Sequence, residues 1–463
     1  MNAQDNSQLA SLAVSLSGGG HRAAIFTLGA LMYLVDAQAN ARVTSIASVS
    51  GGSLTNGFVG QALDFTSADG LTFRQRVASP LATQIAKSGT LFAPLLTKLY
   101  LALLVVVAVL VFATFAVVPG PWYVRLLAFV LGLTVWGWLF GKRGFVCARA
   151  FRTTLFSPAG SATPLSELKK KNLDHVICAT DLRAAQQMFF AGGFVYSFMF
   201  GHGEPANLAL ARAVQASASL PGAFPPANLP TKQHSFTGAS SPADGGPPEP
   251  PGEMVLMDGG VYDNMGDEWA RGFNARLKLW PELGKGREAP KQLVVVNASA
   301  RVPWNPIRLR RIPLVSELAA LVRVIGVMYI NTTNVRRQVI VASNNPAEPA
   351  KASALPGVLV QISQSPFRVA NAFARGTAPV SERARAVLAL LRNEPDSEKK
   401  WAQIAKDNSA VATNLSKLGI DVSGRLMYQG YVVTMCNLHI LFGAEFPLRP
   451  SELAIERFRE LIS

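Results

Sequence analysis

Short apolar runs alternate with longer helical patterns along most of the chain. Runs rich in Val, Ile, Leu and Ala predict strands at residues 9–17, 43–49, 174–179, 254–257 and 293–296. Apolar positions at helical spacing predict helices between them, such as 23–36 and 208–218. Strands that alternate with helices are typical of an α/β fold with a mainly parallel sheet covered on both faces.

The remainder of the pattern divides the chain into parts. Polar residues 1–9 carry no basic residue before an apolar run, so we expect no secretory signal and a first strand beginning near residue 9. Segments rich in Pro, Gly, Ser and Ala predict surface loops at 230–253 and 344–356. Helical patterns follow at 381–392, 397–418 and 450–462. We therefore expect an α/β domain in two parts, 1–97 and 144–300, and a mostly helical C-terminal extension, 301–463.

The segment between the two parts, 98–143, predicts a two-span transmembrane hairpin. Residues 99–118 are uncharged, and after the turn Pro119-Gly120-Pro121 residues 122–140 are apolar apart from Arg125. A bilayer core of about 30 Å needs about 20 helical residues. The Leu, Val and Phe residues of the first span contribute roughly −4 to −8 kcal/mol to insertion. The alternative is a helical hairpin buried in a soluble core.

The charges around this hairpin predict its orientation. Lysines and arginines flank both ends, which predicts an integral membrane protein with two spans whose α/β domain and both termini lie in the cytoplasm. The flanking cations are Lys87, Lys98, Lys142, Arg143, Arg149 and Arg152. Aromatic residues suited to the interfaces are Trp122, Tyr123, Trp136 and Trp138.

Composition narrows the class of protein further. The 463 residues are 49% hydrophobic and only 16% charged, which excludes a disordered chain. The net charge of +15 favours an anionic partner, and without zinc-finger spacing or an RNA-recognition signature we expect a membrane surface and no nucleic acid. Cations that could meet lipid headgroups are Arg301, Arg308, Arg310, Arg311, Arg323, Arg336 and Arg337; the alternative is a solvated basic face.

Candidate chemistry begins at Ser17-Gly18-Gly19-Gly20-His21-Arg22, between a strand and a helix. Consecutive glycines let backbone amides point the same way, and the helix N-terminus adds partial positive charge. Such a loop holds a phosphate or a developing oxyanion. Gly18, Gly20 and Ala23 also fit a dinucleotide fingerprint, but the next strand ends in Ser-Gly-Gly instead of an acidic residue.

Two further motifs supply a nucleophile and a base. Ser50, in Ser48-Val49-Ser50-Gly51-Gly52, fits the nucleophile elbow G-x-S-x-G except that Ser48 replaces the first glycine. Asp258, in Met257-Asp258-Gly259-Gly260, follows a strand and can accept a serine proton if it comes within hydrogen-bond reach. Asp263 is interpreted as a solvated residue of the glycine-rich turn.

Together these motifs resemble the patatin-like phospholipase family over about residues 9–300, without the hairpin. The resemblance matches Gly18, Gly19, Gly20 and Arg22 to the oxyanion loop, Ser50 to the nucleophile and Asp258 to the base. Weaker similarities lie at residues 178–182, 216–226 and 426–431. The resemblance implies a three-layer α/β/α sandwich and a Ser-Asp dyad that hydrolyses acyl esters of lipids, with membrane phospholipid or another acyl-ester lipid as substrate and no cofactor.

Several alternatives stay open at this point. His439 follows Asp258 in the order of an α/β-hydrolase triad, although its apolar surroundings favour a packed or capping residue. His21 is interpreted as a local hydrogen-bond partner. Acyl transfer to an alcohol, a non-catalytic membrane scaffold and a nucleotide-binding protein are the competing functions. The histidines show no metal-ligand spacing, so we expect no metal.

Overall fold

The computed structural model describes most of the chain. The described residues are 10–157, 160–237, 250–299, 313–343, 355–392 and 396–462. The polar start of the chain, the centre of the loop predicted at 230–253 and most of the loop predicted at 344–356 lie outside them. So do Arg301, Arg308, Arg310 and Arg311.

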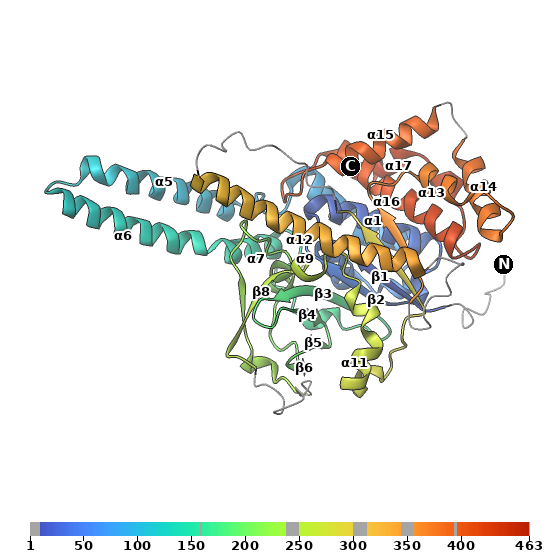
Figure 1. Cartoon of the computed structure of the whole chain (residues 1–463), viewed down its shortest axis with the longest axis horizontal. Coiled ribbons are helices and arrows are strands. Elements are labelled where there is room, and N and C mark those ends of the chain that lie inside the picture. The colour runs from blue at the N-terminus through green and yellow to red at the C-terminus, as the bar shows by residue number, and fades with distance from the viewer. Residues whose placement is uncertain are drawn as a thin grey trace.

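A ten-stranded mixed sheet forms the centre of the molecule (Figure 1). Its parallel half has the order β10-β9-β1-β2-β3. Because parallel strands are covered on both faces, these strands read as nearly continuous apolar runs, which explains why most of them could be predicted. Their bounds are β1 Leu12–Leu16, β2 Val43–Val49, β3 Asp174–Asp181, β9 Gln292–Asn297 and β10 Gly357–Gln361.

The other half of the sheet is antiparallel. Strands β4, β5 and β6 continue from β3, and β8 pairs with both β3 and β7. Of these only β8 was predicted, at 254–257. The bounds are β4 Gln186–Ala191, β5 Phe194–Ser197, β6 Gly201–Gly203, β7 Ala227–Pro230 and β8 Glu253–Asp258.

Helices cover both faces of the sheet, which confirms the three-layer architecture. On one face Val14 and Val294 pack in the core cluster that includes α1 (Gly20–Asp36), α2 (Gly51–Ala62) and α16 (Ile420–Leu441). On the other face lie α10 (Glu268–Arg271), α11 (Phe273–Leu279) and α12 (Pro313–Ser343), where Trp269 and Ile340 pack against alternate strand residues. Shorter helices are α3 Gly70–Phe73, α4 Ser79–Thr83, α8 Leu210–Ser217 and α9 Gly260–Asp263.

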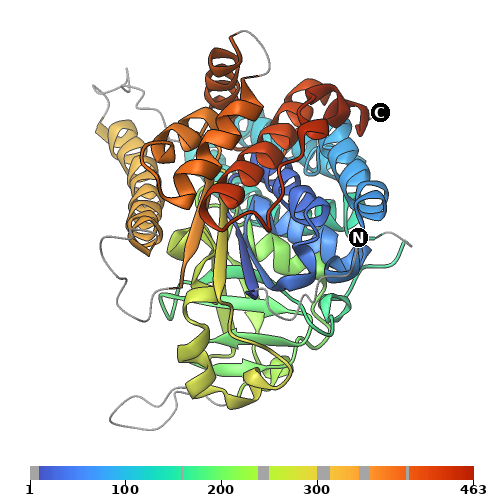
Figure 2. The same cartoon turned by 90° about the vertical axis from the view of Figure 1, so that its right-hand side faces the viewer.

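The C-terminal region is helical as expected, but part of it belongs to the core. Strand β10 pairs with β9, and the long helix α16, which is almost wholly buried, lies along α1 (Figure 2). Neither α16 nor α12 was predicted as a helix. The other helices are α13 Pro366–Phe373, α14 Pro379–Leu391, α15 Ser397–Ala410 and α17 Ile455–Glu460.

The apolar insertion forms a long helical hairpin that projects from the domain (Figure 1). Its helices are α5 (Leu95–Val117) and α6 (Trp122–Gly141), and α7 (Arg143–Thr154) leads back to the body. Helix α6 buries none of its residues, so the hairpin is not part of a soluble core. Within the described residues, three helical segments are by length and composition able to cross a membrane: Leu95–Val117, Trp122–Thr154 and Val315–Ser343.

Candidate active site

The sheet brings the predicted nucleophile and base to one place. Strand β2 runs parallel to β3, with Val49 opposite Cys178, and β8 runs antiparallel to β3, with Asp258 opposite Ala179. Since β4 occupies the other edge of β3, β2 and β8 lie end to end along the same edge. Their carboxyl ends therefore meet, and Ser50 directly follows one of them while Asp258 ends the other.

Ser50 has the strained backbone of a nucleophile elbow. Its φ of 51° and ψ of −115° are unusual for a residue with a side chain, and α2 begins at the next residue. A Cβ on Gly51 would lie 2.0 Å from the Gly20 carbonyl oxygen, and one on Gly52 would lie 2.6 Å from the Leu16 carbonyl oxygen. Only glycine fits at both positions, so the turn can expose the serine hydroxyl.

Ser48 fits this turn by hydrogen bonding. Its buried hydroxyl donates to the Val176 carbonyl at 3.1 Å and accepts from Ser53 at 3.1 Å and from the Asn56 amide at 2.9 Å. The side-chain oxygen of Asn56 in turn shares a hydrogen bond of 2.8 Å with His175. The departure from the glycine pattern is therefore compensated by a polar network beneath the elbow.

Asp258 is a buried carboxyl group held beside Ser50. Its Oδ1 accepts the Gly260 amide at 2.8 Å. Burial raises the pKa of this carboxyl to about 6, while the hydrogen bond from the Gly260 amide and the neighbouring hydroxyls of Ser50 and Tyr329 oppose that shift. A carboxylate with a pKa near 6 is ionised at pH 7 and still basic enough to accept a proton.

Tyr329 is a residue at this site that the sequence analysis missed. It lies on α12, and its ring packs so closely that a Cβ on Gly260 would come within 2.4 Å of its Cε1 atom. The buried hydroxyl lies beside the carboxylate of Asp258. No local motif surrounds Tyr329, because its role depends on a helix packed from a distant part of the chain.

The segment around Ser217 positions both Ser50 and Asp258 through hydrogen bonds. Its hydroxyl accepts the Ser50 amide at 2.9 Å, and its carbonyl accepts the Gly259 amide at 3.2 Å. The Ser219 carbonyl accepts the Asp258 amide at 3.0 Å. The weak similarity at residues 216–226 therefore marks a support that fixes the elbow relative to the carboxyl group.

The glycine loop presents amides next to Ser50, although not all those expected. The Gly18 amide is occupied, since it donates to the Asn264 carbonyl at 3.1 Å. Gly19 and Gly20 have positive φ angles of 140° and 59°, and within the described chain their amides have no acceptor. These two amides, at the N-terminus of α1, are the donors that remain available for an oxyanion.

Arg22 supports the loop from behind. Its side chain is buried and donates to the carbonyl oxygens of Ala298, at 3.0 Å, and Val411. Burial lowers the pKa of its guanidinium to about 10, and no carboxylate pairs with it in the part of the chain that the structure describes. Arg22 therefore adds unneutralised positive charge near the loop, and its hydrogen bonds go to the backbone carbonyls of Ala298 and Val411.

The two histidines considered for catalysis have structural partners. His21 bonds the Ser416 carbonyl at 2.7 Å and the Thr90 hydroxyl at 2.9 Å, and burial lowers the pKa of its imidazole to about 4. His439 lies on α16 and bonds the Phe446 carbonyl at 2.9 Å. Both interpretations as packed or local hydrogen-bonding residues agree with these contacts.

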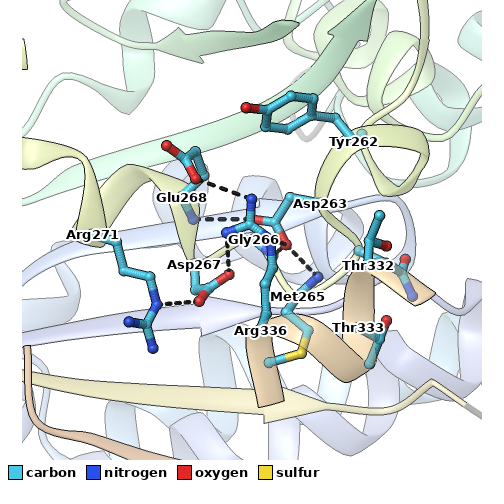
Figure 3. Close-up of polar contacts among 12 residues, drawn as sticks. Tyr262, Asp263, Met265, Gly266, Asp267, Glu268, Arg271, Thr332, Thr333 and Arg336 are labelled. Carbon is cyan, nitrogen blue, oxygen red and sulfur yellow. Dashed lines mark hydrogen bonds and ion pairs between the residues drawn. The ribbon is translucent and has the colours of Figure 1, made fainter. Parts of the chain in front are cut away.

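Helix α12 is tied to the site by a buried ion-pair cluster (Figure 3). Arg336 pairs with Asp267 at 2.9 Å, Glu268 at 3.0 Å and Asp263 at 3.3 Å. Asp263 also accepts the amides of Met265, Gly266 and Glu268. Two expectations are thereby corrected: Asp263 is buried, not solvated, and Arg336 pairs with carboxylates of this chain instead of lipid headgroups.

The arrangement has the parts of an acyl-transfer site: the hydroxyl of a half-buried serine at a tight turn, a buried base and free amides. No group of three or more His, Cys, Asp or Glu that could hold a metal ion occurs among the described residues.

Comparison with known proteins finds one matching family model and several similar solved structures. A family model described as "Patatin-like phospholipase" matches residues 14–266, more than half of the chain. No curated protein sequence matches. Human GIVD cytosolic phospholipase A2 is a similar solved structure, at 12% sequence identity and a TM-score of 0.45. The alignment covers all of this chain and 61% of the human protein, so this chain spans less than two thirds of that protein's length. VipD from Legionella pneumophila aligns over 98% and 91% of the two chains, at 13% identity and a TM-score of 0.25.

Proposed function

Because the chain belongs to the patatin-like phospholipase family, we propose that it is a membrane-anchored serine hydrolase that cleaves carboxylic esters of lipids. The observation that carries the proposal is the end-to-end meeting of β2 and β8, which puts Ser50 and Asp258 side by side. Phospholipids or lysophospholipids are the proposed substrates.

The proposed reaction uses two residues in sequence. The Asp258 carboxylate accepts the Ser50 proton while the hydroxyl oxygen attacks the ester carbonyl. The free amides of Gly19 and Gly20 stabilise the oxyanion, a role worth about 2.7–4 kcal/mol per donor. The alcohol leaves with a proton, and water then attacks the acyl-serine and releases the fatty acid. Arg22 contributes through its charge and through the shape of the loop.

Membrane anchoring is the second part of the proposal. Helices α5 and α6 expose apolar side chains along their length, with Val109 61% and Leu131 58% exposed. Water-exposed apolar surface of this extent is unfavourable unless lipid or protein covers it. The cations that flank the hairpin favour a cytoplasmic domain, which keeps the site close to an insoluble substrate.

The test is turnover by the purified protein in detergent micelles or vesicles. We expect hydrolysis of phospholipid and of a soluble p-nitrophenyl ester, loss of both in Ser50→Ala and in Asp258→Asn, and fluorophosphonate labelling of Ser50. The control Ser67→Ala removes an exposed hydroxyl and should retain activity. Unchanged turnover in Ser50→Ala, or labelling of another residue, contradicts the proposed nucleophile.

The competing functions give different results in the same assays. A non-catalytic scaffold would give neither turnover nor labelling. A Ser-Asp-His triad would lose activity in His439→Ala, whereas the dyad should keep most of it, because His439 bonds Phe446. A nucleotide-binding protein would be stabilised against heat by NAD or ATP. Phospholipid hydrolysis that is lost in Ser50→Ala and kept in His439→Ala separates the proposed function from all three.

A further inference from the structure

Helix α12 has an inner face that belongs to the active site. Tyr329 lies beside Asp258, Arg336 pairs with the carboxylates that follow the Asp-Gly-Gly motif, and Ile340 is 1% exposed against the sheet. Residues 329, 336 and 340 fall on one side of a helix with 3.6 residues per turn. Any displacement of α12 therefore moves a side chain that contacts the proposed base.

A different flank of the same helix carries an exposed apolar stripe. Its members follow each other at helical intervals and are between 43% and 59% exposed. They are Leu321, Val324, Met328, Val335 and Val339, and we call them the α12 stripe. The segment Val315–Ser343 is apolar and long enough to qualify as a membrane-crossing helix, although its inner face is held by the ion pairs described above.

The position of α12 indicates what covers the stripe. Its N-terminal end lies on the side of the domain from which the α5–α6 hairpin projects (Figure 1), and the helix runs along the outer flank of the domain (Figure 2). Between residues 315 and 330 the only charged residues are Glu317 and Arg323. A bilayer that receives the hairpin would therefore meet this end of α12 as well.

We propose that the α12 stripe docks into the acyl-chain and headgroup boundary of the bilayer, so that the membrane engages the helix that places Tyr329 beside Asp258. The docking itself depends on the hairpin being in a membrane, and its effect on hydrolysis rests on the proposed function. Burial of one flank of an amphipathic helix in this boundary is a common mode of lipid binding.

The experiment places a probe on the stripe in the full-length protein reconstituted into phosphatidylcholine vesicles. Leu321→Cys and Val324→Cys are labelled with an environment-sensitive fluorophore, and the three native cysteines are buried. The matched control is Leu71→Cys, an exposed leucine on α3 that is not part of the stripe. Val109→Cys in α5 reports on the hairpin. We expect blue-shifted emission and quenching by doxyl-labelled lipids at 321, 324 and 109, but not at 71.

Two results would overturn the proposal. One is water-like emission at 321 and 324 while the probe at 109 is quenched by lipid. The other is a blue shift that doxyl lipids do not quench, because protein would then cover the stripe, whether a second copy or another segment. Neither readout depends on turnover, so a protein that docks but does not hydrolyse esters would contradict the proposed function alone.

A kinetic arm tests the coupling to the site. Leu321→Ser with Val324→Ser should slow hydrolysis of vesicle phospholipid roughly tenfold or more, because apolar contact with the bilayer is lost. Hydrolysis of a soluble p-nitrophenyl ester should stay near the parent rate, which shows that the site is intact. Equal rates on vesicles for this variant and for Leu71→Ser would contradict the coupling.

Discussion

Asp258 can act as a base only while it is ionised, and burial makes ionisation costly. Since the pKa of this carboxyl is raised to about 6, the protonated form predominates below that pH. We predict that kcat/KM for a soluble ester falls about tenfold per pH unit below about pH 6. A pH–rate profile on the neutral p-nitrophenyl ester measures this. A profile that stays flat to pH 5 would show that this carboxyl is not the base.

Tyr329 adds a second prediction at the scale of single residues. Its hydroxyl stabilises the ionised form of Asp258 and so lowers the pKa of that carboxyl. In Tyr329→Phe the acid limb of the pH–rate profile should move to higher pH, while the rate well above the limb changes less. The variant keeps the ring that packs on Gly260, so a purely structural role for Tyr329 would leave the limb where it is in the parent.

At the scale of elements, helices α1 and α16 cross in close contact in the core. A Cβ on Gly430 would lie 2.0 Å from the Phe26 carbonyl oxygen, and one on Gly29 would lie 2.0 Å from the Met427 carbonyl oxygen. The two backbones touch at these glycines, which lets the buried helices share one core.

We predict that Gly430→Ala lowers the melting temperature of the detergent-solubilised protein, because the helices must separate. Overpacking of this kind costs about 1–3 kcal/mol or more. The matched control is Gly137→Ala in α6, where an added Cβ meets nothing within 4 Å and alanine favours the helix. If both variants melt at the same temperature as the parent, the close crossing of α1 and α16 is wrong.

Features formed by adjacent residues could be predicted from the sequence, whereas contacts between distant residues could not. Strand β2 was predicted with its observed bounds, and the elbow at Ser50 followed from it, because a buried strand and its glycine turn are encoded in adjacent residues. The strand that ends at Asp258 could be predicted for the same reason. Tyr329 and Arg336 could not, because their roles arise only when α12 packs on residues that precede it by many positions in the chain.

The length of an apolar pattern also limited what could be predicted. Strand β6 spans three residues and β5 four, too few for a period to appear. Helix α16 is buried around nearly its whole circumference, so it lacks the polar face that marks an amphipathic helix. In the glycine loop, the sequence indicated an oxyanion site, but only the contact with Asn264 shows that the Gly18 amide is already occupied.

At the scale of the whole molecule, the cations expected to face lipid are scattered, whereas the exposed apolar side chains gather on two elements. Of the cations expected to face lipid, Arg336 lies in an internal cluster, whereas Arg337 is exposed. The apolar surface is more concentrated, on the hairpin and on the α12 stripe. For the proposed membrane anchoring, this distribution favours apolar insertion over attraction between the net charge of +15 and anionic lipid.

This inference gives a prediction for the first span. Each arginine near the centre of a spanning helix costs about 2.5–3.5 kcal/mol, so two nearly cancel the roughly −4 to −8 kcal/mol gained by the apolar residues. Val106→Arg with Val109→Arg should therefore move expressed protein from the carbonate-resistant membrane fraction toward the soluble or aggregated fraction. A single arginine at exposed Leu71, outside the hairpin, should leave fractionation unchanged. High salt should release neither the parent nor the Leu71 variant, because screening weakens charge attraction but not apolar insertion.

Release of the parent by salt, together with unchanged fractionation of the double variant, would mean that surface charge holds the protein and that α5 does not span.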